Sequence, residues 1–291
     1  GPTRGWRPAP GRALARTMTA PDVAVAHRPA DPSKDSGWRQ RVATVLGPTI
    51  LTWALCAYGL GSSQFRGDEL CTWWAATLPE ESFRRLVGHV DAVLAPYYLA
   101  MRWWIRGFGD SEAAMRAPSA MAMGVCAGLV ASLGTRLVGR RVGLRAGLVF
   151  ALLPIVSRYG QEARPYALAA MFATLSSLLL LRLLERPGPF ARAACYAAAL
   201  TGLGLTHLLA LLVLPAHLAC CVRFTRDRPF LVIDRRTFPR VALAAGVGVG
   251  FVLLLVFAGA RQRSAQIGRG GSLPELVGLA SRSISHATLG A

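Results

Sequence analysis

Long apolar segments without a charged residue constrain the fold of this chain more than any other feature. Residues 42–60 and 117–135 each form such a segment of 19 residues, and residues 241–260 form one of 20. A helix of about 20 apolar residues crosses the hydrocarbon core of a bilayer, so each segment is long enough to span a membrane. Burial in a soluble core is the alternative, but so many uncharged segments in one chain favour a multi-span membrane protein.

Shorter apolar segments extend this predicted bundle. They are rich in Ala and Leu and longer than typical strands, which favours helices. The block 193–222 has basic segments at both ends, so it is predicted to be a hairpin of two short helices with its tip near His207. The sequence therefore predicts an all-α fold, a polytopic transmembrane helical bundle of seven spans. The predicted spans are 42–60, 117–135, 142–157, 165–181, 193–206, 208–222 and 241–260.

The basic excess of the chain predicts its orientation in the membrane. The chain has 33 Lys and Arg against 15 Asp and Glu, which gives a net charge of +18. Such a charge can indicate nucleic-acid binding, but the sequence has no zinc-finger spacing, Walker glycine loop or RNP-like aromatic motif. In membrane proteins, an excess of Lys and Arg marks the cytoplasmic loops. A cytoplasmic N-terminus places 21 of the 33 basic residues in the inner segments 1–41, 136–145, 182–192 and 223–240.

The segments outside the spans follow from this orientation. Residues 1–41 are basic and rich in Pro, so they are predicted to form a disordered cytoplasmic tail. The loop 61–116 is predicted to lie outside, with an interfacial helix at Pro96 to Phe108. If 95–108 crossed the membrane instead, all later segments would invert and two arginines would enter the bilayer. Residues 261–291 are predicted to form an outer tail, and the chain is expected to be part of a longer protein.

Two adjacent carboxylates, Asp68 and Glu69, lie in the predicted outer loop. They precede an aromatic stretch that contains Trp73 and Trp74. Desolvation at a membrane surface raises the pKa of a carboxylate, so the pair suits a general base and a metal ligand, with Glu69 as the candidate metal ligand. The alternative is a helix cap, in which Asp68 opens a helix that runs to Leu78 and stabilises its dipole. Asp68 can combine both roles.

Basic and aromatic residues are predicted on the same outer face. A guanidinium group binds two phosphate oxygens at once, so several arginines on one face favour a phosphate-bearing substrate. For any single arginine, contact with lipid headgroups is the alternative. His207 is interpreted as a hydrogen-bonded structural residue rather than as a ligand or acid. The candidate substrate-binding or phosphate-binding residues are Arg84, Arg85, His89, Arg116, Arg158, Glu162, Arg164 and Tyr166.

Four short motifs, taken in order, resemble a known family of membrane enzymes. The motifs are Gly67-Asp68-Glu69, Ala95-Pro96-Tyr97-Tyr98, Gly109-Asp110-Ser111-Glu112 leading to Arg116-Ala117-Pro118-Ser119, and Gln161-Glu162-Ala163-Arg164-Pro165-Tyr166. Together they resemble the GT-C membrane glycosyltransferases, and in particular family 39, the protein O-mannosyltransferase and aminoarabinose-transferase-like family. The resemblance covers residues 60–170, with a weaker likeness through the His207 hairpin. It identifies the chain as the N-terminal transmembrane module of such an enzyme.

The resemblance implies an activity and a set of residue roles. A mannose-like sugar would pass with inversion from a polyprenyl-phosphate donor to a protein, glycan or lipid acceptor, on the extracytoplasmic face of the cell membrane. Asp68 would be catalytic with Glu69 beside it, Arg116 would end the loop, and Glu162 and Arg164 would help to bind the donor phosphate. A divalent metal is compatible with this chemistry. No nucleotide, organic cofactor or nucleic-acid partner is expected.

The sequence also departs from the family pattern. Many relatives carry a histidine two residues before the Pro-Tyr-Tyr stretch, where this chain has Leu94, so His89 would have to substitute. Family members are typically longer. A lipid or polyprenyl-phosphate transporter and a non-catalytic membrane scaffold are the alternative functions. The predicted spans carry almost no charge and show no repeat, which argues against a transporter. A scaffold function would not explain an acidic pair and several arginines on one face.

Overall fold

The described part of the chain is a bundle of helices. The structure is a computed structural model that describes residues 36–185, 190–224, 231–233 and 238–268. Its elements are α1 (Ser36–Ala57), α2 (Gly67–Thr77), α3 (Glu80–His89), α4 (Ala95–Phe108), α5 (Glu112–Leu137), α6 (Arg140–Leu152), α7 (Pro154–Gly160), α8 (Tyr166–Glu185), α9 (Phe190–Thr206), the 3₁₀ helix η1 (Leu208–Leu212), α10 (Val213–Ala219), β1 (Val222–Phe224), β2 (Leu231–Ile233) and α11 (Phe238–Gly268). The predicted helical membrane bundle is confirmed, and the short antiparallel pair of β1 and β2 is its one exception among the described residues.

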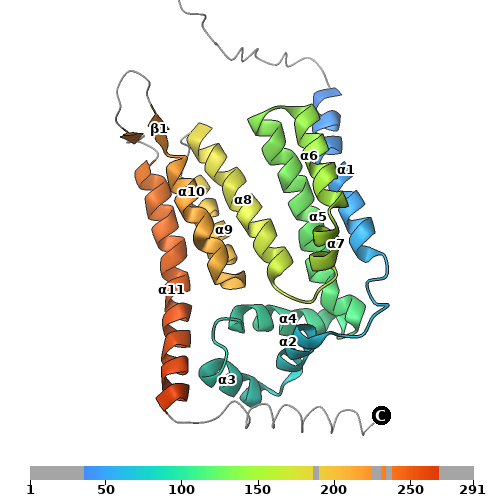
Figure 1. Cartoon of the computed structure of the whole chain (residues 1–291), viewed down its shortest axis with the longest axis vertical. Coiled ribbons are helices and arrows are strands. Elements are labelled where there is room, and N and C mark those ends of the chain that lie inside the picture. The colour runs from blue at the N-terminus through green and yellow to red at the C-terminus, as the bar shows by residue number, and fades with distance from the viewer. Residues whose placement is uncertain (1–35, 186–189, 225–230, 234–237, 269–291) are drawn as a thin grey trace, which may run out of the picture. The chain divides into compact units, whose positions relative to one another are not determined.

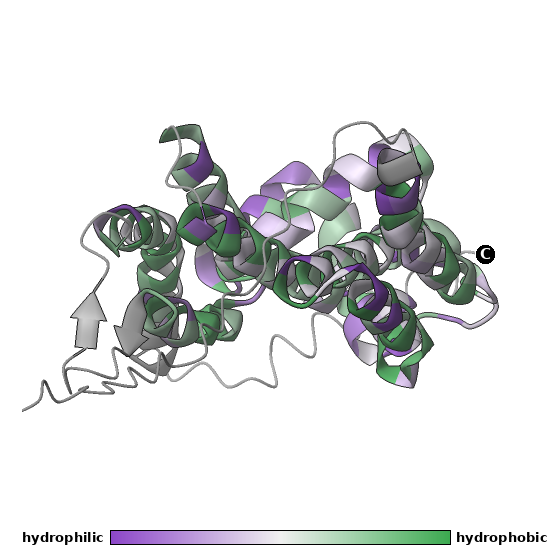
Figure 2. Ribbon diagram, turned by 90° about the horizontal axis from the view of Figure 1, so that it is seen from above, coloured by the Kyte–Doolittle hydropathy of each residue, from purple (hydrophilic) through white to green (hydrophobic). Residues whose placement is uncertain are grey.

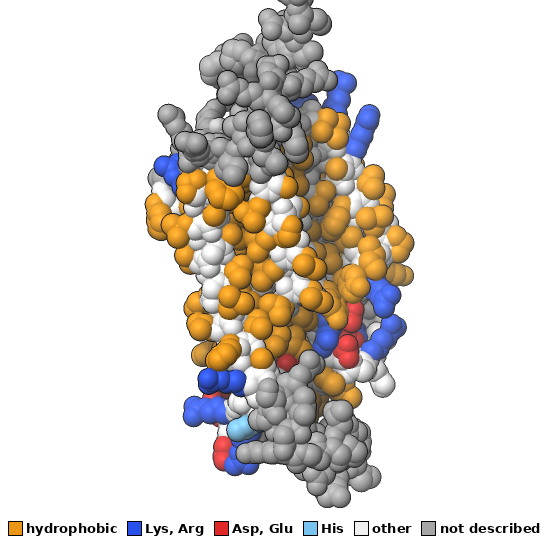
Figure 3. Space-filling view, turned by 60° about the vertical axis from the view of Figure 1, so that its left-hand side comes forward, with side chains coloured by type: hydrophobic (Ala, Val, Ile, Leu, Met, Phe, Trp, Pro, Cys, Tyr) orange, Lys and Arg blue, Asp and Glu red, His pale blue; other side chains and the backbone are white. Residues whose placement is uncertain are grey.

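The long helices pack side by side (Figure 1). α5 packs against α6 and α8, α8 against α9, and α9 against α11. α1 contacts α5 through Trp53, whose indole Nε1 donates to the Met121 carbonyl at 3.1 Å. Hydrophobic residues occur throughout these helices when they are seen end-on (Figure 2). They also cover the surface between charged ends (Figure 3), as expected for helices surrounded by lipid.

Among the described residues, three helices are long and apolar enough to cross a membrane: α5, α8 and residues Phe238–Arg261 of α11. A fourth span results if α6 and α7, which meet at an angle of 64°, form one bent span. Pro154 explains this bend, because it begins α7 and has no amide hydrogen with which to continue α6. The single helix predicted at 142–157 is therefore two helices. The topology of seven spans stays a prediction.

The ends of two helices also differ from the predicted boundaries. α1 begins at Ser36, so its first turns include the last residues of the predicted tail 1–41. α11 continues to Gly268, beyond the predicted span end at residue 260. The remaining parts of the predicted tails, 1–35 and 269–291, lie outside the described residues.

The predicted outer loop 61–116 contains α2, α3 and α4, which lie across the lower end of the bundle (Figure 1). The helix predicted at Pro96 to Phe108 is α4. These helices share a core that includes Phe83, Tyr97 and Met101, all less than 8% exposed. The segment 61–116 therefore forms a packed layer that can hold side chains in fixed positions.

The block 193–222 turns near His207, but its second half is not the single helix predicted at 208–222. α9 ends at Thr206, and η1 followed by α10 leads back along it. Tyr196 and His217 lie at similar distances from this turn in the sequence, and their side chains are hydrogen-bonded at 2.9 Å. His217 also hydrogen-bonds Ser177 of α8 at 3.0 Å, so it joins three helices.

Close packing between α5 and α6 depends on glycine. A Cβ atom added at Gly143 would lie 2.1 Å from the Thr135 hydroxyl oxygen and 2.4 Å from the Ala131 carbonyl oxygen. Gly143 and Gly147 form a GxxxG spacing, and Gly246 and Gly250 of α11 form another. A Cβ atom added at Gly246 would have no described neighbour within 4 Å. The two spacings are alike in sequence, but only the first allows close helix contact in the described part of the chain.

We expect Gly143→Ala to lower the free energy of unfolding by about 1–3 kcal/mol, because the added methyl group overpacks the α5–α6 contact. The matched substitution Gly246→Ala should leave stability unchanged or raise it, since Ala favours helices. Thermal unfolding in detergent measures both. Equal unfolding midpoints for the two variants would contradict the glycine contact.

Candidate active site

The first turn of α2 carries the two adjacent carboxylates. Arg66 is the N-cap residue, with an extended backbone, and the helix begins at Gly67. Glu69 accepts a hydrogen bond from the backbone N–H of Arg66 through Oε2 at 3.2 Å. The capping carboxylate is thus Glu69, and the predicted capping role of Asp68 is wrong. Asp68 lies within the first turn, where the helix dipole favours a negative charge.

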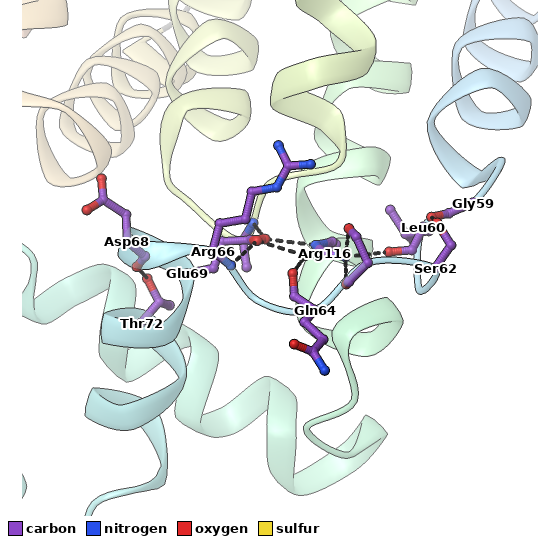
Figure 4. Close-up of polar contacts among 11 residues, drawn as sticks. Gly59, Leu60, Ser62, Gln64, Arg66, Asp68, Glu69, Thr72 and Arg116 are labelled. Atoms are coloured by element: carbon purple, nitrogen blue, oxygen red, sulfur yellow. Dashed lines mark hydrogen bonds and ion pairs between the residues drawn. The ribbon is translucent and has the colours of Figure 1, made fainter. Parts of the chain in front are cut away.

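A buried ion pair joins Glu69 to Arg116 of α5 (Figure 4). Oε1 of Glu69 accepts from Arg116 Nε at 2.8 Å and from the Ala163 backbone N–H at 2.9 Å. Oε2 accepts from Arg116 Nη2 at 2.8 Å in addition to Arg66. A carboxylate has about four lone-pair sites, so these contacts occupy all of them. Only 4% of the Glu69 side chain and 2% of the Arg116 side chain are exposed.

Arg116 is saturated in the same way. Its Nη1 donates to the carbonyls of Leu60 and Ser63, both at 2.9 Å, and its Nη2 donates to the Gln64 carbonyl at 3.1 Å. With the two bonds to Glu69, these contacts use all five N–H donors of the guanidinium. Arg116 was predicted to bind phosphate, yet here every donor is directed at the protein. It fixes the segment that connects α1 to α2.

The same contacts determine the charge of Glu69. Burial acts to raise its pKa, but hydrogen bonds from Arg116, Ala163 and Arg66 outweigh burial and hold the pKa of Glu69 below its ordinary value of 4.5. Glu69 is therefore ionised at neutral pH. A general base works best when its pKa is near the working pH, so Glu69 is poorly suited to that role.

Asp68 is the accessible member of the pair. Its side chain is 67% exposed, and Oδ2 lies 3.3 Å from Nη2 of Arg164. Oδ1 makes no hydrogen bond to a described residue. Figure 4 shows the Asp68 and Glu69 side chains pointing in different directions from the start of α2. The neighbouring carboxylates thus face different surroundings.

Asp68 lines a polar cavity of about 470 Å³. Arg66 and Arg158 add positive charge to its wall, and Glu162 is a further acid beside Asp68 and Glu69. Its volume lies within the range of about 300–1,000 Å³ that is usual for ligand sites. The lining residues are Gly59, Leu60, Ser63, Arg66, Asp68, Glu69, Arg116, Arg158, Gln161 and Glu162.

Arg164 and Tyr166 line a second pocket of about 210 Å³, together with His207 and Leu94. The Tyr166 ring lies 5.7 Å from the His207 ring and 5.7 Å from the Arg164 guanidinium. Burial acts to lower the pKa of Arg164, but contacts with Tyr166 and Asp68 outweigh burial and raise this pKa above its ordinary value. The ion pair of Arg164 and Asp68 therefore connects the two pockets.

Three of the predicted site residues lie elsewhere. Arg84, Arg85 and His89 are on α3 and line neither pocket. Arg84 pairs with Glu80 at 3.0 Å, and Arg85 pairs with Glu81. The two arginines are 77% and 72% exposed, so these are ion pairs between successive turns of a surface helix.

Three other residues belong to the site but were not predicted there. Arg66 and Gln161 line the cavity, and His207 lines the second pocket. Gln161 Nε2 donates to the carbonyls of Cys56 at 3.1 Å and Tyr58 at 2.7 Å, which ties the turn after α7 to the end of α1. Gln161 is the first residue of the fourth motif and Arg66 directly precedes the first motif, which was a usable signal. Nothing in the sequence indicated that His207 would lie next to Arg164.

The described residues contain no conventional cluster of metal-binding side chains. They contain no group of three or more His, Cys, Asp and Glu side chains placed to hold one ion. The lone pairs of Glu69, the candidate ligand, are occupied by Arg116, Ala163 and Arg66. Glu69 therefore has no lone pair left with which to hold the divalent metal that the resemblance allowed.

Comparison with known families identifies the class of protein. A family model described as dolichyl-phosphate-mannose-protein mannosyltransferase matches residues 90–259, more than half of the chain. The chain belongs to this family. This mannosyltransferase-like protein is therefore a membrane glycosyltransferase of the GT-C class, and the predicted resemblance is confirmed. No curated protein and no solved structure matches the chain significantly.

The family match begins at residue 90 and therefore covers Arg116, the turn from Arg158 to Tyr166, and His207. It does not include Asp68 or Glu69. The contrast between these two carboxylates therefore comes from their geometry, which buries Glu69 in an ion pair with Arg116 and leaves Asp68 exposed beside Arg164.

We expect Glu69→Ala and Arg116→Ala each to destabilise the mannosyltransferase-like protein by about 3–5 kcal/mol, because each leaves an unpaired buried charge. The double variant should lose less than the sum of the two, since it removes both charges. Thermal unfolding of the wild type, the two single variants and the double variant in detergent measures the coupling energy between Glu69 and Arg116. Additive losses would contradict the ion pair.

Proposed function

We propose that this membrane glycosyltransferase moves a mannose-like sugar from a polyprenyl-phosphate donor to a hydroxyl of a protein, glycan or lipid. The reaction takes place on the extracytoplasmic face of the cell membrane, in a protein of seven spans with a cytoplasmic N-terminus. The observation that supports this proposal most strongly is the division between the adjacent carboxylates. Glu69 is engaged by Arg116, whereas Asp68 lines a polar cavity whose wall also carries Arg66 and Arg158.

Asp68 is the proposed general base. Its carboxylate takes the proton of the acceptor hydroxyl while the acceptor oxygen bonds to the anomeric carbon of the sugar. The bond between that carbon and the phosphate oxygen breaks, and the electron pair leaves with the phosphate. Attack from the side opposite the phosphate gives a single displacement with inversion. General-base assistance of this kind contributes about 10²–10⁴-fold to the rate.

Arginines around Asp68 are proposed to stabilise the charge of the departing phosphate. Arg66 and Arg158 line the cavity together with Asp68, and Arg164 forms an ion pair with the Asp68 carboxylate. Fixed cationic donors at the position where charge develops lower the barrier without reorganisation. Glu69 and Arg116 are positioning residues in this proposal, because they hold the start of α2 against α5 and the turn after α7.

We expect Asp68→Asn to lower turnover by about 10²–10⁴-fold, because the amide cannot accept the hydroxyl proton. The measurement is transfer of labelled sugar from polyprenyl-phosphate sugars in membranes that contain equal amounts of each protein. Glu81→Gln is the matched control, since Glu81 is an exposed acid of α3 that pairs with Arg85. It should retain full turnover.

Glu162→Gln separates the roles of Asp68 and Glu162, the two cavity acids that are not paired with Arg116. If Asp68 is the base, Glu162→Gln keeps more activity than Asp68→Asn. Full turnover by Asp68→Asn would remove Asp68 from the mechanism. A wild-type protein that binds the donor but transfers no sugar under any acceptor condition would instead favour a lipid transporter or scaffold.

A further inference from the structure

An apolar groove of about 580 Å³ lies between α9 and α11. α8 runs from the turn that holds Arg164 to the opposite end of the bundle, and α9 and α11 both begin at that end (Figure 1). The groove is therefore distant from α2, α3 and α4 and shares no lining residue with the two pockets of the candidate active site. Its volume is usual for a ligand site.

Small residues create this groove. Where α9 and α11 touch, a Cβ atom added at Gly248 would lie 2.9 Å from the Ala197 carbonyl oxygen, so the two backbones are in close contact. Towards the start of both helices the groove is lined by Ala244, which is 5% exposed, and by Ala197 and Ala198. Methyl groups leave space there that longer side chains would fill. Atoms that line such a space lack packing partners on one side, so a ligand that fills it gains contacts.

The groove opens on the apolar outer surface of the bundle. Phe190, Leu243 and Val247 line it and are 82%, 65% and 60% exposed. Leu243 and Val247 belong to the part of α11 that is long and apolar enough to cross a membrane. In a bilayer these side chains face hydrocarbon, so an acyl chain can enter the groove from the side.

Arg240 is the only charged residue among the described residues that line the groove. It lies in the first turn of α11, is exposed, and forms no ion pair with another described residue. Arg182 and Arg192 are next in sequence to the lining residues Leu183 and Ala193, which adds positive charge at this end. Basic pockets between spanning helices bind the head groups of anionic lipids.

Charge favours a lipid over a second copy of the chain as the occupant. A helix of a second copy would need an acid to pair with Arg240. Glu185 is the acid that the described helices carry at this end, and it already pairs with Arg136 at 2.6 Å. A phospholipid supplies a phosphate for Arg240 and an apolar chain for the rest of the groove.

We propose that this groove binds an anionic phospholipid, with its phosphate on Arg240 and one acyl chain between α9 and α11. In the orientation proposed above, the lipid comes from the cytoplasmic leaflet. Its acyl chain fills the space beside Ala197 and Ala244 and so stabilises the contact between the two helices. This inference goes beyond the proposed function, and neither depends on the other.

Lipid binding to the full chain in detergent micelles tests the site. The probes are phosphatidylglycerol and phosphatidylcholine with identical acyl chains. We expect phosphatidylglycerol to bind more tightly, and Arg240→Gln to weaken its binding about fivefold to tenfold, because the variant loses the cation that holds the phosphate. Arg261→Gln is the matched control and should bind normally. Arg261 lies on the same helix, about 30 Å along its axis from Arg240, and stacks on Phe257.

Ala198→Phe tests the apolar part of the groove. Ala198 is exposed and lines the groove, so the phenyl ring should take the place of the acyl chain and weaken binding of both lipids. Cys195→Phe is the matched control, because Cys195 is an exposed residue of α9 that does not line the groove. Thermal unfolding without lipid shows whether each variant is folded. If Arg240→Gln does not fold, a photoreactive phosphatidylglycerol on the wild type should label the peptides that contain Ala198 or Leu243.

Three results would overturn the lipid site. The first is equal affinity of the wild type for the two lipids, and the second is wild-type affinity for phosphatidylglycerol in folded Arg240→Gln or labelling confined to other peptides. The third is a dimer that forms without added lipid and that Ala198→Phe dissociates, which would show that a second copy occupies the groove. None of these results bears on sugar transfer, because Asp68 lies at the other end of the bundle.

Discussion

The buried ion pair of Glu69 and Arg116 is the interaction on which the rest of the site depends. It brings together four segments that are distant in sequence: the connection after α1, the start of α2, the start of α5 and the turn after α7. All acceptor sites of the carboxylate and all donors of the guanidinium are used within the protein. Buried charges are costly without such complete pairing, so the arrangement permits little variation in geometry.

This saturated pair gives two neighbouring carboxylates different surroundings. Glu69 is ionised, buried and engaged, and Asp68 is left exposed at the edge of the same helix turn. Asp68 lines the polar cavity and pairs with Arg164, which lines the small pocket. Fixed positions for base, acceptor and leaving group are what a displacement at a sugar carbon requires.

Local composition predicted the helical membrane bundle and the helix at Pro96 to Phe108, and the basic segments on both sides of 193–222 predicted a turn near His207. It did not predict the bend at Pro154 or the helix at the end of the basic tail. The roles of Asp68 and Glu69 were beyond the sequence, since Glu69 is defined by Arg116, 47 residues later, and by the Ala163 amide, 94 residues later. Arg84 and Arg85 resembled phosphate ligands, yet acids one turn away pair with them.

The most direct test of this account is an experimental structure of the protein bound to polyprenyl phosphate. We expect the phosphate beside Arg164, with both hydrogen bonds between Glu69 and Arg116 unchanged. Phosphate bound by Arg116, or a cation bound by Glu69, would show that the ion pair opens to bind substrate. Either result would contradict the division between a structural and a catalytic carboxylate.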